Sequence, residues 1–339
     1  MTKPQLTRRA FGGLAIATAL SPMLASMARA QDSLSVAFVI HGTLGDKSFF
    51  DSAAEGLRRA EADLGIDLTI IEAGLDRGRW QPALADAVDQ GFDVVIAGTW
   101  EMSGFMSELA VDYPDTKFIL FDDAPDFTDG QNPTILAINY EVATASYLAG
   151  YAAAKVSKSG KVGTILGVEG GPILEFSRGF EAGALAANPD VTVVHAVAGS
   201  FGDPAKGKEL ALAQFAQGID VVFPIAGATG IGALQAARDE GKLAVGVDSD
   251  QATIFADTDA AQAAVIMTSV EKRVGDSLYT ALTQVIAGEA PFGSNLVLGL
   301  SDNAVGISEN AQYEALVPAE VRAEIEELKA RFISGELTI

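Results

Sequence analysis

Residues 93–98 read Asp-Val-Val-Ile-Ala-Gly, a short apolar run that ends at a glycine. A run of this length and composition is typical of a strand that is buried on both faces of a sheet. An amphipathic stretch at 82–90 precedes it and predicts a helix, and a second apolar run at 117–121 follows it. Strands that alternate with helices predict βαβ units and a parallel sheet.

The same alternation extends in both directions along the chain. Further strands are expected at 34–40 and 68–72, and a helix that Ser48 can cap is expected at 49–64. The pattern restarts after a helix expected at 141–156, with strands at 161–168, 191–197, 221–225 and 243–247 and helices at 176–187, 205–217 and 231–240. Two similar halves without a low-complexity linker predict an α/β fold of two doubly wound parallel-sheet domains joined by several strands.

Composition excludes several classes of site and partner. The 339 residues include 23 Lys and Arg against 45 Asp and Glu, which gives a net charge of −22. A surface this acidic repels phosphate backbones, so nucleic acid is not an expected partner. The sequence has no cysteine, which excludes disulfides, cysteine metal sites and a lipid-modified N-terminal cysteine, and its two histidines, His41 and His195, exclude a histidine-rich metal site. We expect neither a metal nor a cofactor.

Residues 1–30 have the composition of an export signal. A basic start is followed by an apolar run at 11–27, and residues 28–30 read Ala-Arg-Ala, a small-x-small cleavage pattern. Residues 7–11, Thr-Arg-Arg-Ala-Phe, have the form of a twin-arginine signal. An N-terminal membrane anchor is the alternative, although glycines and a proline in the apolar run weaken a spanning helix. The sequence therefore predicts cleavage after Ala30 and a periplasmic protein that is not a lipoprotein.

The residues that follow each strand are the candidates for a binding site, because ligands of open parallel sheets bind beyond the carboxyl ends of the strands. These residues are unusually polar and aromatic, and a cleft between the two domains is the expected place for them. They include Asp46, Phe49, Phe50, Trp100, Asp122, Phe201, Gly227 and Asp248. His41 ends the first strand and either faces the cleft or supports a neighbouring residue, whereas His195 lies within an apolar strand and is expected in the core.

No enzyme motif accompanies these candidates. The patterns HExxH, GxSxG and GxGxxG are absent from the sequence, and no set of nucleophile, base and orienting group stands out. Residues 202–209 read G-x-x-x-x-G-K-E, but a P-loop needs Ser or Thr in place of Glu209 to bind Mg²⁺. We expect instead a turn capped by Asp203, with Pro204 at the first helical position. Gly227 opens a glycine-rich segment that either presents backbone N–H groups to a ligand or allows close helix–sheet packing.

Several segments occur together in the order found in one family. They read Gly-Asp-Lys-Ser-Phe at 45–49, Val-Asp-Gln-Gly-Phe-Asp at 88–93, Tyr-Leu-Ala-Gly-Tyr-Ala-Ala at 147–153, Gly-Ser-Phe at 199–201, Gly-Ala-Thr-Gly at 227–230 and Gly-Val-Asp-Ser-Asp-Gln at 246–251. The chain thereby resembles the basic membrane protein family of solute receptors, which includes the purine nucleoside receptor A-like proteins. The resemblance covers nearly the whole mature chain. It implies a type I periplasmic binding fold, a small-molecule ligand, and the permease and ATPase subunits of an ABC importer as partners.

The resemblance also implies roles for individual residues. Phe49 and Phe201 match the aromatic pair that clamps a flat base in nucleoside receptors of the family, and such stacking is worth about 1–3 kcal/mol per base. Asp248 and Lys272 match an acid and a lysine that could read ribose hydroxyl groups through charge-assisted hydrogen bonds. Asp122 matches the acid after the fourth strand.

The chain departs from the family pattern at two places. Phe50 stands where an asparagine is usual, and residues 40–42 read Ile-His-Gly where many members carry an aspartate. Both departures lie near the expected ligand, so they bear on its identity more than on the fold.

We therefore expect a periplasmic monomer that delivers a purine nucleoside or a similar flat heterocycle to an ABC importer, and not an enzyme. A free base, a riboflavin-like ring system or a sugar is the alternative ligand. An exported nucleoside or glycoside hydrolase is the alternative class, and it needs two carboxylates about 5–9.5 Å apart, for which Asp46, Asp122 and Asp248 are the candidates. The expected division is a signal peptide at 1–30, an N-terminal lobe at 31–139 and about 270–290, and a C-terminal lobe at 140–269 and about 291–339.

Overall fold

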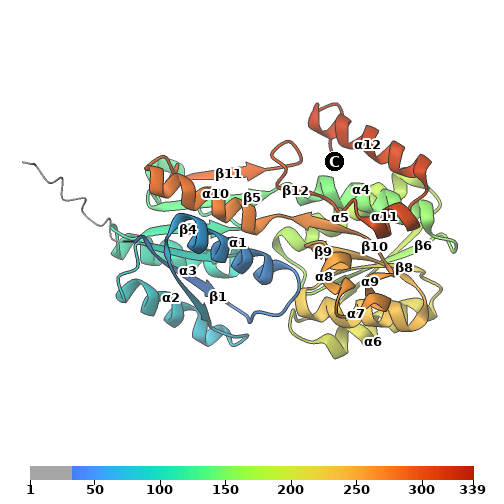
Figure 1. Ribbon diagram of the computed structural model, residues 1–339, viewed down its shortest axis with the longest axis horizontal. Helices are drawn as coiled ribbons and strands as arrows, with labels where there is room; N and C mark the ends of the chain where they lie inside the picture. The colour runs from blue at the N-terminus through green and yellow to red at the C-terminus, as the bar shows by residue number, and fades with distance from the viewer. Residues whose placement is uncertain (1–32) are drawn as a thin grey trace, which may run out of the picture. The chain divides into compact units, whose positions relative to one another are not determined.

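The computed structural model describes residues 33–339, so the predicted signal peptide at 1–30 and its cleavage site lie outside the described residues. The described chain forms two six-stranded sheets with helices packed on them (Figure 1). This arrangement confirms the predicted α/β fold with two doubly wound, mainly parallel sheets. No helix within 33–339 has the length and apolar character that a membrane crossing requires.

The first sheet has the strand order β11-β5-β4-β3-β1-β2, and every neighbouring pair is parallel. Its strands are β1 (Ser35–Ile40), β2 (Asp67–Glu72), β3 (Val94–Gly98), β4 (Lys117–Phe121), β5 (Ile135–Tyr140) and β11 (Ser294–Leu298). Its helices are α1 (Phe49–Leu64), α2 (Trp80–Asp89), α3 (Trp100–Asp112) and α10 (Val274–Ala287), and short 3-10 turns lie at Arg77–Arg79 and Thr128–Gly130. We call this sheet and its helices the first lobe.

The second sheet has the strand order β12-β10-β9-β8-β6-β7, and only the β12–β10 pair is antiparallel within the described chain. Its strands are β6 (Lys161–Leu166), β7 (Thr192–Val197), β8 (Val221–Ile225), β9 (Leu243–Asp248), β10 (Ile266–Lys272) and β12 (Val305–Ile307). Its helices are α4 (Val142–Val156), α5 (Gly171–Ala187), α6 (Pro204–Ala216), α7 (Gly227–Glu240), α8 (Gln251–Ala256), α9 (Ala260–Ala263), α11 (Ala311–Leu316) and α12 (Ala319–Ile333). We call this sheet and its helices the second lobe.

The central strands are continuous apolar runs because helices cover both faces of each sheet. In β1, Phe38 and Ile40 pack in the same buried cluster as Leu57 of α1. Val39, which points to the opposite face, packs in a second cluster with Leu84 of α2. Burial on both sides thus explains why these strands lack the alternation of apolar and polar residues that a half-exposed strand has.

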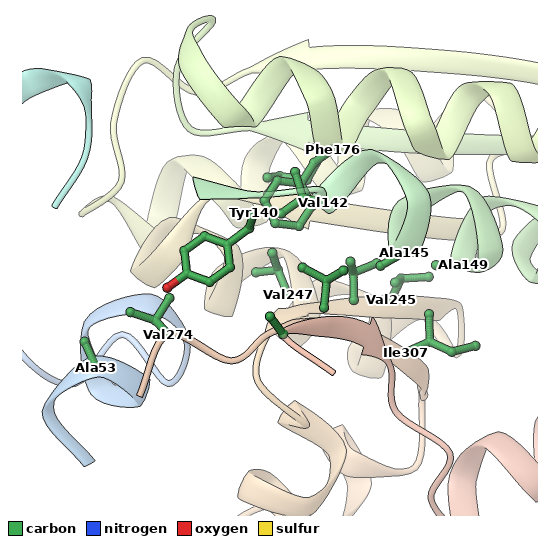
Figure 2. Packing of buried hydrophobic residues seen from close by; sticks show 14 of the residues in the cluster. Ala53, Tyr140, Val142, Ala145, Ala149, Phe176, Val245, Val247, Val274 and Ile307 are labelled. Carbon is green, nitrogen blue, oxygen red and sulfur yellow. The ribbon is translucent and has the colours of Figure 1, made fainter. Parts of the chain in front are cut away.

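The chain passes between the lobes three times, from β5 into α4, from β10 into α10, and from β11 to β12. Buried side chains of both lobes form one continuous cluster across these connections. In Figure 2, Tyr140 at the end of β5 points its hydroxyl end toward Val274 of α10, and Val142 of α4 lies on its other side. These connections form the predicted multi-strand hinge.

Sheet membership differs from the expected division at two strands. Residues from about 291 onward are expected in the C-terminal lobe, whereas β11 pairs with β5 in the first sheet. The last residues of β10 fall in the range expected for the N-terminal lobe, whereas β10 pairs with β9 in the second sheet. Both strands lie beside a hinge connection, so the sheet that each one joins depends on contacts between distant parts of the chain and not on the local sequence pattern.

His195 does not lie in the core, so that expectation is wrong. Strand β7 is an edge strand of the second sheet, and the His195 side chain is 38% exposed. Its Nδ1 contacts the hydroxyl groups of Thr164 and Ser177 at 2.8 and 3.2 Å, and its Nε2 lies 3.4 Å from a carboxylate oxygen of Glu181. An edge strand can be as apolar as a central one, so its sequence does not reveal the exposed position.

Candidate ligand-binding site

A cavity of about 390 Å³ lies at the carboxyl ends of the strands and is lined by residues of both lobes. Its volume falls in the usual range for small-molecule sites, about 300–1,000 Å³. All ten predicted site residues line it, namely His41, Asp46, Phe49, Phe50, Trp100, Asp122, Phe201, Gly227, Asp248 and Lys272. Topology explains why these residues line one cavity, because the carboxyl ends of parallel strands lie at one edge of each sheet. The role of these residues in binding stays a prediction.

Asp46 organises the loop that leads into α1. Its Oδ1 accepts hydrogen bonds from the backbone N–H groups of Ser48 and Asp51, each at 3.1 Å, and its Oδ2 accepts one from Phe50 at 2.9 Å. Burial raises the pKa of Asp46 above its usual value, although these three donors oppose the shift. The expectation that Ser48 caps the helix with its side chain is wrong, because its hydroxyl group finds no partner among the described residues. Asp46 supplies the capping oxygens instead.

Aromatic rings approach the cavity from both lobes. In the first lobe, the Phe49 ring packs against the rings of Phe50 and Phe121, with centroids 5.1 and 5.3 Å away. In the second lobe, the Phe201 ring covers Gly167, where a Cβ atom would overlap the ring. The Phe201 carbonyl group accepts a hydrogen bond from the backbone N–H of Thr229 at 2.9 Å, which fixes this loop to the start of α7. Phe49 and Phe201 are therefore held independently, one by each lobe.

Lys272 ends β10 at the hinge and carries a buried positive charge into the cavity wall. Its side chain is 2% exposed, and its Nζ donates a hydrogen bond to Asp122 Oδ2 at 2.8 Å and lies 3.6 Å from Asp248 Oδ1. The same ammonium lies 4.5 Å from the centroid of the Phe49 ring, which is cation–π geometry. A buried charge needs such partners because its hydration is lost. The ion pair joins the first lobe, through Asp122, to a strand of the second.

Three residues at the carboxyl ends of strands adopt left-handed backbone conformations. Thr99, Asp122 and Asp248 have φ values of 76°, 68° and 62°. Non-glycine residues hold such angles only where the surroundings demand it, and these positions cluster at binding sites. All three line the cavity. The backbone turns sharply at each strand end, which directs these side chains into the space between the lobes.

Each of the two carboxylates beside Lys272 has an oxygen atom that can still accept a hydrogen bond from a ligand. One oxygen of Asp122 and one of Asp248 are buried without a hydrogen-bond partner among the described residues. Burial raises the pKa of Asp248 to about 6, with Lys272 opposing the shift and the charges of Asp122 and Asp46 adding to it. A ligand that donates hydroxyl groups would satisfy these oxygens.

The raised pKa of Asp248 predicts a pH-dependent stability. The pKa of Asp248 in the folded chain, about 6, exceeds the ordinary aspartate value of 3.8, so the folded chain takes up a proton as the pH falls through about 6 and gains stability. Between pH 7.5 and pH 5, we expect the free energy of unfolding of the ligand-free protein to rise by about 1 kcal/mol relative to Asp248→Asn, which cannot titrate. Urea unfolding of both proteins at the two pH values measures this difference. Parallel pH profiles would contradict the assignment.

Contacts across the mouth of the cavity hold the two lobes together. The Trp100 ring of the first lobe covers Gly171 at the start of α5, where a Cβ atom would overlap the ring. The side-chain amide of Gln251 donates to the Lys47 carbonyl group at 3.1 Å, between the second lobe and the first. These two contacts join the first lobe to the second beside the cavity.

Sequence reasoning missed several residues of the wall. Thr99, Trp80 and Phe176 line the cavity unpredicted, whereas Glu101, which also lines it, is expected there as one of the residues that follow β3. Thr99 precedes Trp100 directly after β3, so the strand-end rule is a signal that points to it as well. Trp80 begins α2 and Phe176 lies inside α5, away from any strand end, and no local pattern marks them.

The arrangement of charges suits binding more than bond cleavage. Both oxygens of Asp46 accept backbone hydrogen bonds, and Asp122 and Asp248 face the same ammonium group of Lys272. A hydrolase needs one carboxyl group free to protonate a leaving group and another free to activate a nucleophile. Within residues 33–339, no group of three or more ligating side chains could hold a metal ion.

Comparisons with known proteins agree on one class. A family model described as ABC transporter substrate-binding protein PnrA-like matches residues 33–338. Basic membrane protein A of Borreliella afzelii is 30% identical over 308 residues, which cover 90% of each chain. A solved ABC-transporter solute-binding protein from Aeropyrum pernix has a TM-score of 0.81 at 24% identity and covers 90% of this chain and 92% of its own. One from Conexibacter woesei has a TM-score of 0.70 at 26% identity, with 91% and 98% covered.

The family model and both solved structures describe binding proteins of transporters and not enzymes. Such proteins bind a small molecule and work with the membrane subunits of a transporter, which agrees with a two-lobed fold around a ligand-sized cavity. The match extends over all but the last of the described residues. The chain therefore belongs to the PnrA-like family of ABC-transporter substrate-binding proteins.

Proposed function

We propose that this binding protein carries a purine nucleoside, or a similar flat heterocycle that bears a sugar, to an ABC importer, and that it acts as a monomer. The observation that carries the proposal is the presence of two kinds of group in the cavity wall, aromatic rings and hydrogen-bond acceptors. Phe49 and Phe201 supply aromatic faces from opposite lobes, and Asp122 and Asp248 supply hydrogen-bond acceptors beside Lys272. A nucleoside has the matching parts, a planar ring and a sugar rich in hydroxyl donors.

Stacking and hydrogen bonding would act together on such a ligand. A ring between Phe49 and Phe201 gains contact on both faces and links the two lobes, so binding would favour the closed form. Sugar hydroxyl groups would donate to the unpartnered oxygens of Asp122 and Asp248, and a hydrogen bond to a charged acceptor is stronger than one between neutral groups.

The charges of the wall favour a neutral ligand over a phosphorylated one. Four carboxylates line the cavity, those of Asp46, Glu101, Asp122 and Asp248, against the single ammonium of Lys272. Lys272 is already paired with two of the acids. A phosphate group would therefore meet uncompensated negative charge in a place shielded from water.

Isothermal titration of the purified protein tests the proposal. We expect adenosine and inosine to bind with one site per chain, and we expect AMP, the free bases, ribose and riboflavin to bind at least about tenfold more weakly. Ligand at 100 times its Kd should also raise the free energy of unfolding by about 2.7 kcal/mol.

Three results, from titration, from prolonged incubation and from light scattering, would contradict the proposal. Tighter binding of ribose, a free base or riboflavin would assign the cavity to that ligand. Release of free base from the nucleosides on prolonged incubation would indicate a hydrolase. A mass of two chains by light scattering would contradict the monomer.

We also propose that residues 1–30 export the protein to the periplasm through the twin-arginine route, with cleavage after Ala30. The support is the sequence Thr-Arg-Arg-Ala-Phe before an apolar run. Replacing Arg8 and Arg9 together by lysine should leave full-length precursor in the cytoplasm, while binding by the precursor stays normal because both residues precede the binding fold. Normal recovery of the double variant from the periplasm would exclude this route.

A further inference from the structure

His41 lies at the end of β1, in a part of the cavity wall apart from the Lys272 ion pair. It is 7% exposed, and its ring makes edge contacts with the rings of Phe50 and Trp80, with centroids 5.1 and 5.2 Å away. These aromatic neighbours fix the plane of the imidazole. They also leave its two nitrogen atoms in different surroundings.

Nε2 of His41 faces two oxygen atoms of the first lobe. It lies 3.2 Å from Thr99 Oγ1 and 3.4 Å from Glu101 Oε2. A carboxylate only accepts hydrogen bonds, so the nearby Glu101 oxygen favours the tautomer that carries its proton on Nε2, in which Thr99 Oγ1 can also accept. In the neutral imidazole the other nitrogen, Nδ1, then carries a lone pair and acts as an acceptor. Arg77, whose Nη1 lies 3.8 Å from Glu101 Oε1, keeps this carboxylate in place.

Nδ1 of His41 is buried and has no hydrogen-bond partner among residues 33–339. Buried polar atoms without partners are rare, and this one belongs to a residue that lines the ligand cavity. The protein has thus fixed an acceptor in the wall and supplies no donor for it. A ligand with a donor at this place would complete the pairing.

The position of His41 in the sheet indicates which part of a ligand it meets. The first sheet places β3 between β1, which ends beside His41, and β4, which ends beside Asp122. Neighbouring strands lie about 4.8 Å apart, so the ends of β1 and β4 are separated by about 10 Å. A nucleoside whose sugar contacts Asp122 and Lys272 would therefore extend its ring toward His41.

We propose that His41 determines specificity by accepting a hydrogen bond from an N–H group on the edge of the ligand's heterocycle. The site then binds a heterocycle that carries an amino group or a ring N–H at that edge more tightly than the same heterocycle without such a donor. This inference rests on the proposed nucleoside function and adds the identity of the group that is read. A site built to pair with a donor rejects an analogue that lacks it, because the buried acceptor is then left unpaired.

Adenosine and purine riboside provide the test, because they differ only in the amino group on the purine ring. We expect the wild-type protein to bind adenosine at least about tenfold more tightly than purine riboside. His41→Phe keeps an aromatic ring but has no acceptor, so its affinities for the two nucleosides should agree within about twofold. They should converge because the affinity for adenosine falls, while the affinity for purine riboside stays close to that of the wild type. His41→Asn places an amide oxygen close to the position of Nδ1 and should keep most of the preference, so it serves as the second variant if the phenylalanine variant folds poorly.

His195→Phe is the matched control, because His195 lies on an outer edge strand and does not line the cavity. Its ratio of affinities should equal that of the wild type. Equal binding of the two nucleosides by the wild type, or an unchanged preference in His41→Phe, would overturn the role of His41 and leave the nucleoside proposal standing. If neither nucleoside binds, both proposals are wrong.

Discussion

Replacing Lys272 with methionine should lower the free energy of unfolding by about 3–5 kcal/mol at pH 7.5, the usual effect of removing one partner from a buried ion pair. Methionine fills much of the volume of the lysine side chain, so the main loss is the charge. Without the ammonium, the carboxylates of Asp122 and Asp248 remain buried beside each other and lose the group that Asp122 contacts at 2.8 Å. Urea unfolding monitored by circular dichroism measures the change.

A second pH and a surface lysine provide the controls for Lys272→Met. At pH 5 the loss should be smaller, because protonation of one buried carboxyl group removes the unpaired charge. Lys329 pairs with Glu309 at 3.0 Å on the surface of the second lobe, and Lys329→Met should change stability by no more than about 1 kcal/mol. A Lys272→Met protein as stable as the wild type at both pH values would mean that the ion pair does not hold the hinge.

Phe49→Ala and Phe201→Ala should each weaken ligand binding by about 1–3 kcal/mol, which is roughly 5- to 150-fold in Kd. This is the range for the loss of one contact between an aromatic side chain and a base. The loss of binding free energy in the double variant should be smaller than the sum of the two single losses, because a ligand ring that one phenylalanine alone contacts is already free to move. Isothermal titration with the nucleoside that binds the wild type most tightly measures these changes.

The two phenylalanines should differ in their effect on stability. Phe49 packs against Phe121 and faces the Lys272 ammonium, so Phe49→Ala should also destabilise the ligand-free fold. Phe201 packs on Gly167 at the cavity, so its replacement should affect binding more than folding. Phe332, which contacts Tyr147 in the second lobe away from the cavity, is the matched control, and Phe332→Ala should bind normally. If both Phe→Ala variants bind as tightly as the wild type, the rings belong only to the protein core.

The parallel-sheet core was predictable from sequence because a strand buried on both faces must be apolar throughout. The runs at 117–121 and 221–225 coincide with β4 and β8, and the predicted helix at 49–64 coincides with α1. The same rule predicted the candidate site, since Asp122 directly follows β4, Asp248 ends β9, and ligands bind at the carboxyl ends of parallel strands. These features depend on local pattern and on one general rule of topology.

Features that depend on contacts between distant parts of the chain were not predictable in the same way. Strands β10 and β11 lie beside the crossings at the hinge, and the sheet that each one joins depends on these long-range contacts. Ser48 has the sequence position of a helix cap, but Asp46 lies closer to the free N–H groups once the loop has folded. The pairing of Lys272 with Asp122 joins residues 150 positions apart and follows from the contact between the lobes.

The most direct test of the account is mass spectrometry of the small molecule that the protein carries when it is purified, without denaturation, from the cells in which it naturally works. Unfolding the protein should release one equivalent of a compound per chain, because the cavity of about 390 Å³ has room for one small molecule between the lobes. We expect the mass and fragmentation pattern of a purine nucleoside that carries no phosphate and has an N–H group on its ring. A sugar, a flavin or a nucleotide in its place would contradict the assignment.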